Sequence, residues 1–158
     1  MADADVDYSK IDDHPKHAIR LFKVMMRIEF ALKDLGFCRQ RGNAVEVAWD
    51  EYAAKNISRD FFERVISSGR ANVLIADPPK RQTIDPGGSL SWERVGAVST
   101  VQDLLGAVRR VRNNLFHGGK SGDPDGDRNE ELICGATYVL DEILRNDDIL
   151  MTAFSGKY

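Results

Sequence analysis

A short polar cluster ends an otherwise apolar segment at residues 110–120, which reads RVRNNLFHGGK. A guanidinium at Arg112, an amide at Asn113 and an imidazole at His117 lie within six residues. Histidine has a reference pKa of about 6.5 and exchanges protons near neutral pH, whereas a guanidinium keeps its charge and can bind two phosphate oxygens at once. These residue types favour general acid–base chemistry beside a bound phosphate.

The cluster lies at the end of a predicted helix. Thr100 and Asp103 have the spacing of a capping box, and the helix that they begin should run to about His117, where two glycines end it. Four apolar residues fall within about 60° of one another on its wheel and are the predicted buried stripe: Leu104, Val108, Val111 and Leu115. The polar cluster, together with Arg109 and Phe116, falls on the opposite face or at its edge and should line a groove.

The hexapeptide Arg112-Asn113-Asn114-Leu115-Phe116-His117 resembles the motif of the HEPN family (higher eukaryotes and prokaryotes nucleotide-binding). Ribonucleases of that family carry an arginine, a polar residue, usually three more residues and then a histidine near a helix end. The resemblance implies a helical fold over residues 16–145. It also implies metal-independent RNA cleavage at a homodimer interface, where two copies of the motif meet.

The resemblance assigns a role to each motif residue. Arg112 would stabilise the charge on phosphorus, His117 would transfer a proton, and Asn113 would orient His117 or bind the phosphate. The 2′-hydroxyl of RNA would be the nucleophile, so no cofactor is expected and the products would carry 2′,3′-cyclic phosphate and 5′-hydroxyl ends. Further expectations are phosphate contacts from Arg109 and Lys120, and a Phe116 ring buried at the dimer interface.

Two functions remain open on this basis. The first is an endoribonuclease acting as a toxin or defence effector, restrained by an antitoxin or another regulatory protein. The alternative is a non-catalytic HEPN module that binds RNA, a nucleotide or a protein partner through the same groove.

Other charged clusters predict no metal site. His14 and His17 follow two aspartates in a polar segment before a helix, which is typical of a solvated surface. The acidic stretch at 123–131 is similar to a calcium-binding loop, but Cys134 stands where the closing glutamate is required. Glu29 and Lys33 lie one turn apart and are interpreted as a surface ion pair, although both could face the groove.

The remaining pattern predicts a single all-α domain, a bundle of about five helices spanning residues 16–158 behind a flexible acidic arm at 1–15. The first helix starts at Lys16 and weakens at Gly36, with Ile19, Phe22, Met26 and Phe30 recurring in steps of three and four. The other expected helices cover 44–55, 59–67 (capped by Ser58), 100–117 and 130–145. Prolines and glycines make 76–92 one long loop, and strand-like alternation is confined to short pieces such as 72–76.

Composition agrees with one domain. The chain has 158 residues, of which 42% are hydrophobic, and its net charge of −3 provides no overall positive field for a polyanion. Cys38 and Cys134 are far apart, which excludes a zinc ribbon built on paired cysteines and favours a reducing compartment. The sequence shows neither an apolar leader nor a run of roughly 20 apolar residues, so a cytoplasmic protein with no membrane partner is expected.

Overall fold

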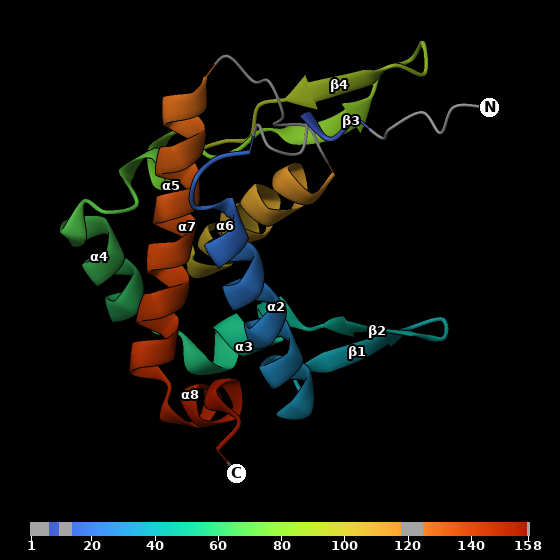
Figure 1. Ribbon diagram of the computed structural model, residues 1–158. Helices are drawn as coiled ribbons and strands as arrows, with labels where there is room; N and C mark the ends of the chain where they lie inside the picture. The colour runs from blue at the N-terminus through green and yellow to red at the C-terminus, as the bar shows by residue number, and fades with distance from the viewer. Residues whose placement is uncertain (1–6, 10–13, 118–124, 158) are drawn as a thin grey trace.

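The computed structural model describes residues 7–9, 14–117 and 125–157, so most of the predicted arm at 1–15, and Lys120, lie outside the described residues. Seven helices and four short strands follow one another in the described part of the chain (Figure 1). They are α2 (Ala18–Asp34), β1 (Cys38–Arg41), β2 (Ala44–Val47), α3 (Trp49–Asn56), α4 (Arg59–Ser68), α5 (Asn72–Ala76), β3 (Arg81–Ile84), β4 (Leu90–Glu93), α6 (Val101–Phe116), α7 (Gly126–Asn146) and α8 (Asp148–Ser155).

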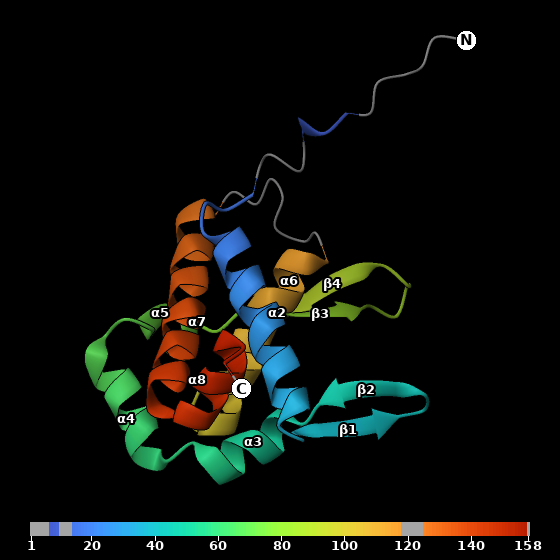
Figure 2. The same ribbon diagram turned by 60° about the horizontal axis from the view of Figure 1, so that its bottom comes forward.

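Helices α2, α6 and α7 contact one another pairwise and enclose the centre of the hydrophobic core (Figures 1 and 2). Leu21 and Ile28 of α2, Leu104 and Val108 of α6 and Leu140 of α7 are almost completely buried. The helix α8 packs across α2 and α7, and the short α5 packs on α6 and α7. This arrangement places the end of α6 beside the start of α2.

The predicted all-α bundle of about five helices is wrong, because two antiparallel hairpins, β1–β2 and β3–β4, project from the helical body (Figure 2). The first hairpin occupies residues that were expected to begin a helix at Ala44. Gly42 has a φ of +60° at the turn, a conformation that glycine adopts without strain and that suits a tight two-residue hairpin. Because β2 pairs with β1 through residues 44–47, the helix begins only at Trp49.

The second hairpin lies within the predicted loop at 76–92. Asp85 accepts two hydrogen bonds at its turn, from the backbone N–H of Gly88 to its carbonyl and from that of Ser89 to its carboxylate, each at 2.9 Å. As predicted, no helix runs through the segment. Its proline and glycines form the turn between two strands, and the segment is therefore a hairpin and not one long loop. Four residues a side are too few for alternation to be recognised in the sequence.

Two short helices also differ from expectation. Residues 72–76, interpreted as strand-like, form α5, whose Leu74 is buried against α7. An apolar run of this length does not separate a strand from a helix. The helix α8 was not predicted; it begins because the Asp147 carboxylate accepts the backbone N–H of Leu150 at 2.9 Å.

Three expectations about helices are confirmed. The helix after Ser58 starts with the Ser58 hydroxyl accepting the backbone N–H of Phe61 at 3.2 Å, and it ends at Gly69. The capping box of Thr100 and Asp103 is present in both directions at the start of α6. The last long helix covers 130–145 and extends slightly beyond it at both ends. Among the described residues, none of the helices combines the length and apolarity that crossing a membrane requires.

Candidate functional site

The helix α6 carries the motif and is held on its inner face. Leu104, Val108 and Val111 are buried, and Leu115 is half-buried, so the predicted stripe is confirmed. Asn114 is also buried, and its side-chain amide donates to the backbone carbonyl of Lys80 at 3.0 Å. This bond connects the segment leading into β3 to the inner face of α6.

Arg112 forms an ion pair with Glu29 of α2. The two side chains are 29% and 25% exposed, so the pair is partly shielded from water. The Nη2 group of Arg112 donates to the carboxylate of Glu29. The Nε and Nη1 donors of Arg112 have no protein acceptor within the described part of the chain. A guanidinium has five N–H donors, so a phosphate can still bind while Glu29 holds the side chain in place.

A groove of about 460 Å³ runs between the start of α2 and the end of α6. Arg112 provides charge at its wall, while Phe22 and Phe116 provide aromatic surface. The complete lining is His14, Pro15, Lys16, Ala18, Ile19, Leu21, Phe22, Arg112, Leu115 and Phe116. The groove is therefore mainly apolar, with Lys16 and Arg112 as the charged residues of its lining.

Phe116 and His117 project at the end of α6. The Phe116 ring is 64% exposed, yet it stacks on Phe22 with ring centroids 5.9 Å apart. His117 is the exposed C-terminal capping residue, and its imidazole packs edge-on against Phe116 at 6.0 Å. It does not line the groove among the described residues, and within one chain no hydrogen bond joins it to Arg112.

The outward side of α2 continues this aromatic surface. Ile19, Phe22, Met26 and Phe30 are exposed by 67%, 43%, 56% and 50%, and they follow one another along the helix at three- and four-residue steps. Together with Phe116, these four residues form what we call the outer apolar row. A contiguous patch of large, exposed apolar side chains is typical of a surface that another molecule covers.

The other predicted site residues lie outside the groove. Asn113 is half-buried, and its side chain has no hydrogen-bond partner among the described residues; the buried amide of the pair is Asn114. Arg109 is half-buried on α6, and Lys33 is exposed and does not pair with Glu29, contrary to the interpretation of a surface ion pair between them. Glu29 pairs instead with Arg112, whose side chain lines the groove.

Arg109 belongs to a group of cations beside the second hairpin. Burial lowers the pKa of the Arg110 guanidinium, and repulsion from Arg81 and Arg109 adds to this effect, so the three charges lie close together. Arg110 also donates to the backbone carbonyl of Pro79 at 3.2 Å. These three cations, with Asp103 also close to Arg110, are a local concentration of positive charge in a chain of negative net charge.

Sequence reasoning did not find two arrangements. One is the buried Asn114, whose neighbour Asn113 was chosen because it matched the motif position. The other brings His17 together with Glu130 and Cys134 of α7. The spacing of Glu130 and Cys134, one helical turn apart, was readable in the sequence, but nothing in it linked them to a histidine over one hundred residues earlier.

Comparison with known proteins yields no relationship: the chain matches no protein-family model, no curated protein and no solved structure.

Proposed function

We propose that this protein is a metal-independent endoribonuclease that acts as a homodimer. The observation that supports this best is the position of Arg112, which Glu29 holds at the wall of a groove with donors left for a phosphate. The helix that carries Arg112 ends in the exposed pair Phe116 and His117. The proposal rests on these contacts together with the resemblance of the hexapeptide to the HEPN motif.

A second copy would complete the site. Arg112 and His117 are five residues apart on α6, which separates them by about 140° around the helix, so one chain does not direct both at the same phosphate. The outer apolar row lies next to both groups and offers a surface for a twofold interface. Two chains meeting on this row would bring the ends of both α6 helices together.

The proposed reaction needs only the RNA and these side chains. The 2′-hydroxyl attacks the neighbouring phosphorus, the bond from phosphorus to the 5′-oxygen breaks, and a 2′,3′-cyclic phosphate remains on one product. One His117 would accept the proton of the 2′-hydroxyl, and the His117 of the other copy would donate a proton to the departing 5′-oxygen. Arg112 would stabilise the negative charge that develops on the phosphate oxygens.

Substrate binding would extend beyond the motif. Arg109, with Arg81 and Arg110 beside it, offers phosphate contacts along one side of α6. Lys120 was predicted to add another such contact and lies outside the described residues. A toxin or defence role, restrained by an antitoxin or regulatory protein, and action in the cytoplasm belong to the same proposal.

The decisive experiment compares cleavage of mixed RNA and of DNA by the full chain in the presence of a chelator. We expect RNA products with 2′,3′-cyclic phosphate and 5′-hydroxyl ends, and intact DNA. Replacing His117 with alanine should lower the rate by about 10²- to 10⁴-fold, since it removes general acid–base catalysis. Arg112→Ala should lower both the rate and RNA affinity, because phosphate binding is lost as well.

Arg41→Ala is the matched control, because Arg41 is an exposed arginine on the β1–β2 hairpin and lies outside the groove lining. It should cleave like the parent. Cleavage that disappears in chelator and returns with magnesium would overturn the mechanism. A His117→Ala protein as active as the parent, with its fold confirmed by circular dichroism, would do the same.

The second candidate function is a non-catalytic module that binds RNA, a nucleotide or a protein partner. One observation favours it: Glu29 already neutralises Arg112, and His117 lies outside the groove lining. Salt-dependent RNA binding that Arg112→Ala weakens, with no cleavage by the parent protein, would identify this function instead.

A further inference from the structure

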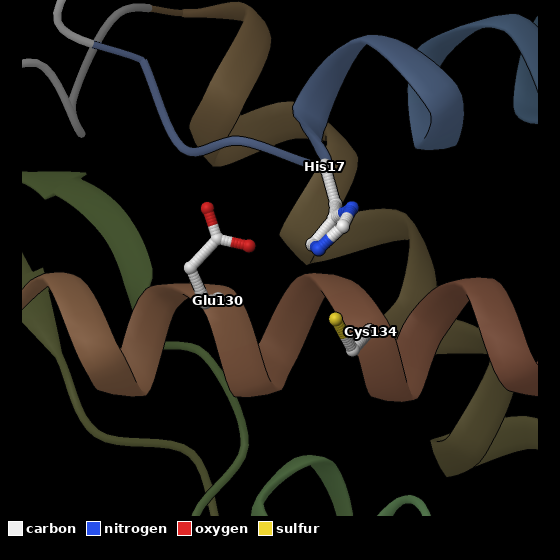
Figure 3. Close-up of side chains that lie close together, drawn as sticks. All are labelled: His17, Glu130 and Cys134. Carbon is white, nitrogen blue, oxygen red and sulfur yellow. The ribbon is translucent and has the colours of Figure 1, made fainter.

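Three side chains that can bind a metal ion meet where the chain enters α2 beside α7 (Figure 3). His17 precedes α2 directly, and Glu130 and Cys134 lie one turn apart on α7, both toward His17 (Figure 3). The imidazole nitrogen, the carboxylate oxygen and the sulfur all lie within 4.8 Å of one another. None of the three residues belongs to the groove lining.

Glu130 supplies an independent indication of a missing partner. Its oxygen Oε2 is buried and has no hydrogen-bond partner among the described residues. A buried carboxylate oxygen without a partner is destabilising, and native proteins rarely leave one in this state. A cation bound at this point would give the Glu130 carboxylate a partner of opposite charge.

The other two groups are available for binding. His17 occupies the N-terminal capping position of α2, but its side chain makes no capping hydrogen bond. Cys134 is a free cysteine. Burial and the negative charge of Glu130 raise the pKa of the Cys134 thiol, in agreement with the short separation between the two groups.

We propose that His17, Glu130 and Cys134 bind one Zn²⁺ ion, with a water molecule as the fourth ligand. Nitrogen and sulfur donors beside a single carboxylate suit zinc, whereas magnesium and calcium prefer sites built from oxygen alone. Zinc ligands lie roughly 2.0–2.3 Å from the ion, which in a tetrahedron separates them by about 3.3–3.8 Å. Separations of up to 4.8 Å therefore need to shorten by at most about 1.5 Å, within the reach of side-chain rotation.

The site would have a structural effect next to the groove. Lys16 and Ala18, the neighbours of His17, line the groove beside Arg112. A zinc ion would tie the start of α2 to α7 and so fix one wall of that groove. The proposed RNA cleavage takes no step through this ion.

The test uses the full chain, stripped of metal with a chelator and then titrated with Zn²⁺ in competition with a chromogenic chelator. We expect one equivalent to bind. Losing a residue that merely supports a ligand typically weakens metal affinity by roughly 10- to 100-fold, so Cys134→Ser and His17→Ala should weaken it at least that much. Glu130→Gln keeps the side-chain shape while removing its charge, and it should also weaken binding.

Cys38→Ser is the matched control, because Cys38 is the chain's other cysteine, is also exposed and lies on β1 outside the cluster. It should bind zinc like the parent. Cobalt(II) provides a second readout: the parent and Cys38→Ser should show a thiolate-to-cobalt absorption band in the near ultraviolet, and Cys134→Ser should lack it. Equal zinc affinity in the parent, Cys134→Ser and Glu130→Gln, or a cobalt spectrum without that band in the parent, would overturn the proposal.

The Cys134→Ser protein also separates this site from the RNA chemistry. It should still cleave RNA in chelator, because Arg112 and His117 are unchanged. Zinc binding without cleavage would support the metal site and contradict the proposed enzyme, whereas cleavage without zinc binding would do the reverse.

Discussion

The helix α2 has two apolar rows, and only one of them is buried within the chain. Leu21, Met25, Ile28 and Leu32 are buried to within 1% of complete burial. The outer apolar row, represented on this helix by Ile19, Phe22, Met26 and Phe30, is at least 43% exposed at every position. Both rows have similar side chains and similar spacing, so apolar periodicity alone did not identify which would face the core.

The outer apolar row keeps apolar surface in contact with water. Removing such surface from water contributes roughly 25 cal/mol for each Å². A molecule that covers the row would therefore gain free energy of binding. Glu29 lies between the two rows, about 70° from the centre of each around the helix, and there it pairs with Arg112. The motif arginine is therefore held at the boundary between the core and the surface available for association.

The largest expected effect concerns the buried row. Ile28→Ala should lower the free energy of unfolding by about 2–5 kcal/mol, because it removes buried methylene groups and leaves a cavity. Met26→Ala, in the outer row of the same helix, should change it by no more than about 0.5 kcal/mol in dilute, monomeric protein. Urea denaturation of both variants measures the contrast. Equal destabilisation would mean that the two rows do not differ in the way described.

The next effect concerns association through the outer row. Phe22→Ala should weaken dimerisation by about 5-fold or more, since truncating a central aromatic side chain of an interface typically costs more than about 1 kcal/mol. Sedimentation equilibrium over micromolar concentrations measures it. Ile66→Ala is the control, because Ile66 is exposed on α4 and should not affect association. A parent protein that stays monomeric at tens of micromolar would contradict the dimer.

The smallest effect concerns the start of α6, where the side chains of Thr100 and Asp103 cap the helix. Thr100→Ala should lower the free energy of unfolding by about 1 kcal/mol through loss of the cap, measured by urea denaturation at pH 7.

Burial works against ionisation of Asp103, but hydrogen bonds from Ser99 and Thr100 lower its pKa overall. Its stabilisation is therefore present above the unfolded pKa of about 3.9 and is lost as the pH falls through the lower folded value.

Asp103→Asn isolates this pH dependence. The parent should be more stable than the variant at pH 7, and the difference should shrink steadily as the pH falls below about 3.9. A difference that is constant from pH 7 to pH 2.5 would show that the Asp103 charge contributes nothing to the cap.

Local interactions explain what the sequence predicted well. The capping box at Thr100 and the cap at Ser58 each depend on residues within one helical turn, and the buried stripe of α6 repeats along a single helix. Both hairpins were missed because their strands have four residues each, and their pairing joins segments whose alternation is too short to recognise. The short helix α5 was misread for the same reason.

The sequence by itself determined the extent of α6 and α4, the order of charged and apolar residues along the motif, and the resemblance on which the proposed ribonuclease rests. Only the tertiary structure decided which row of α2 is buried, that Glu29 pairs with Arg112 rather than with Lys33, and that His17 meets Glu130 and Cys134. The physical reason is the range of the forces involved. Caps and helical stripes are satisfied within a few residues, whereas ion pairs and metal ligands across helices depend on how α2, α6 and α7 pack.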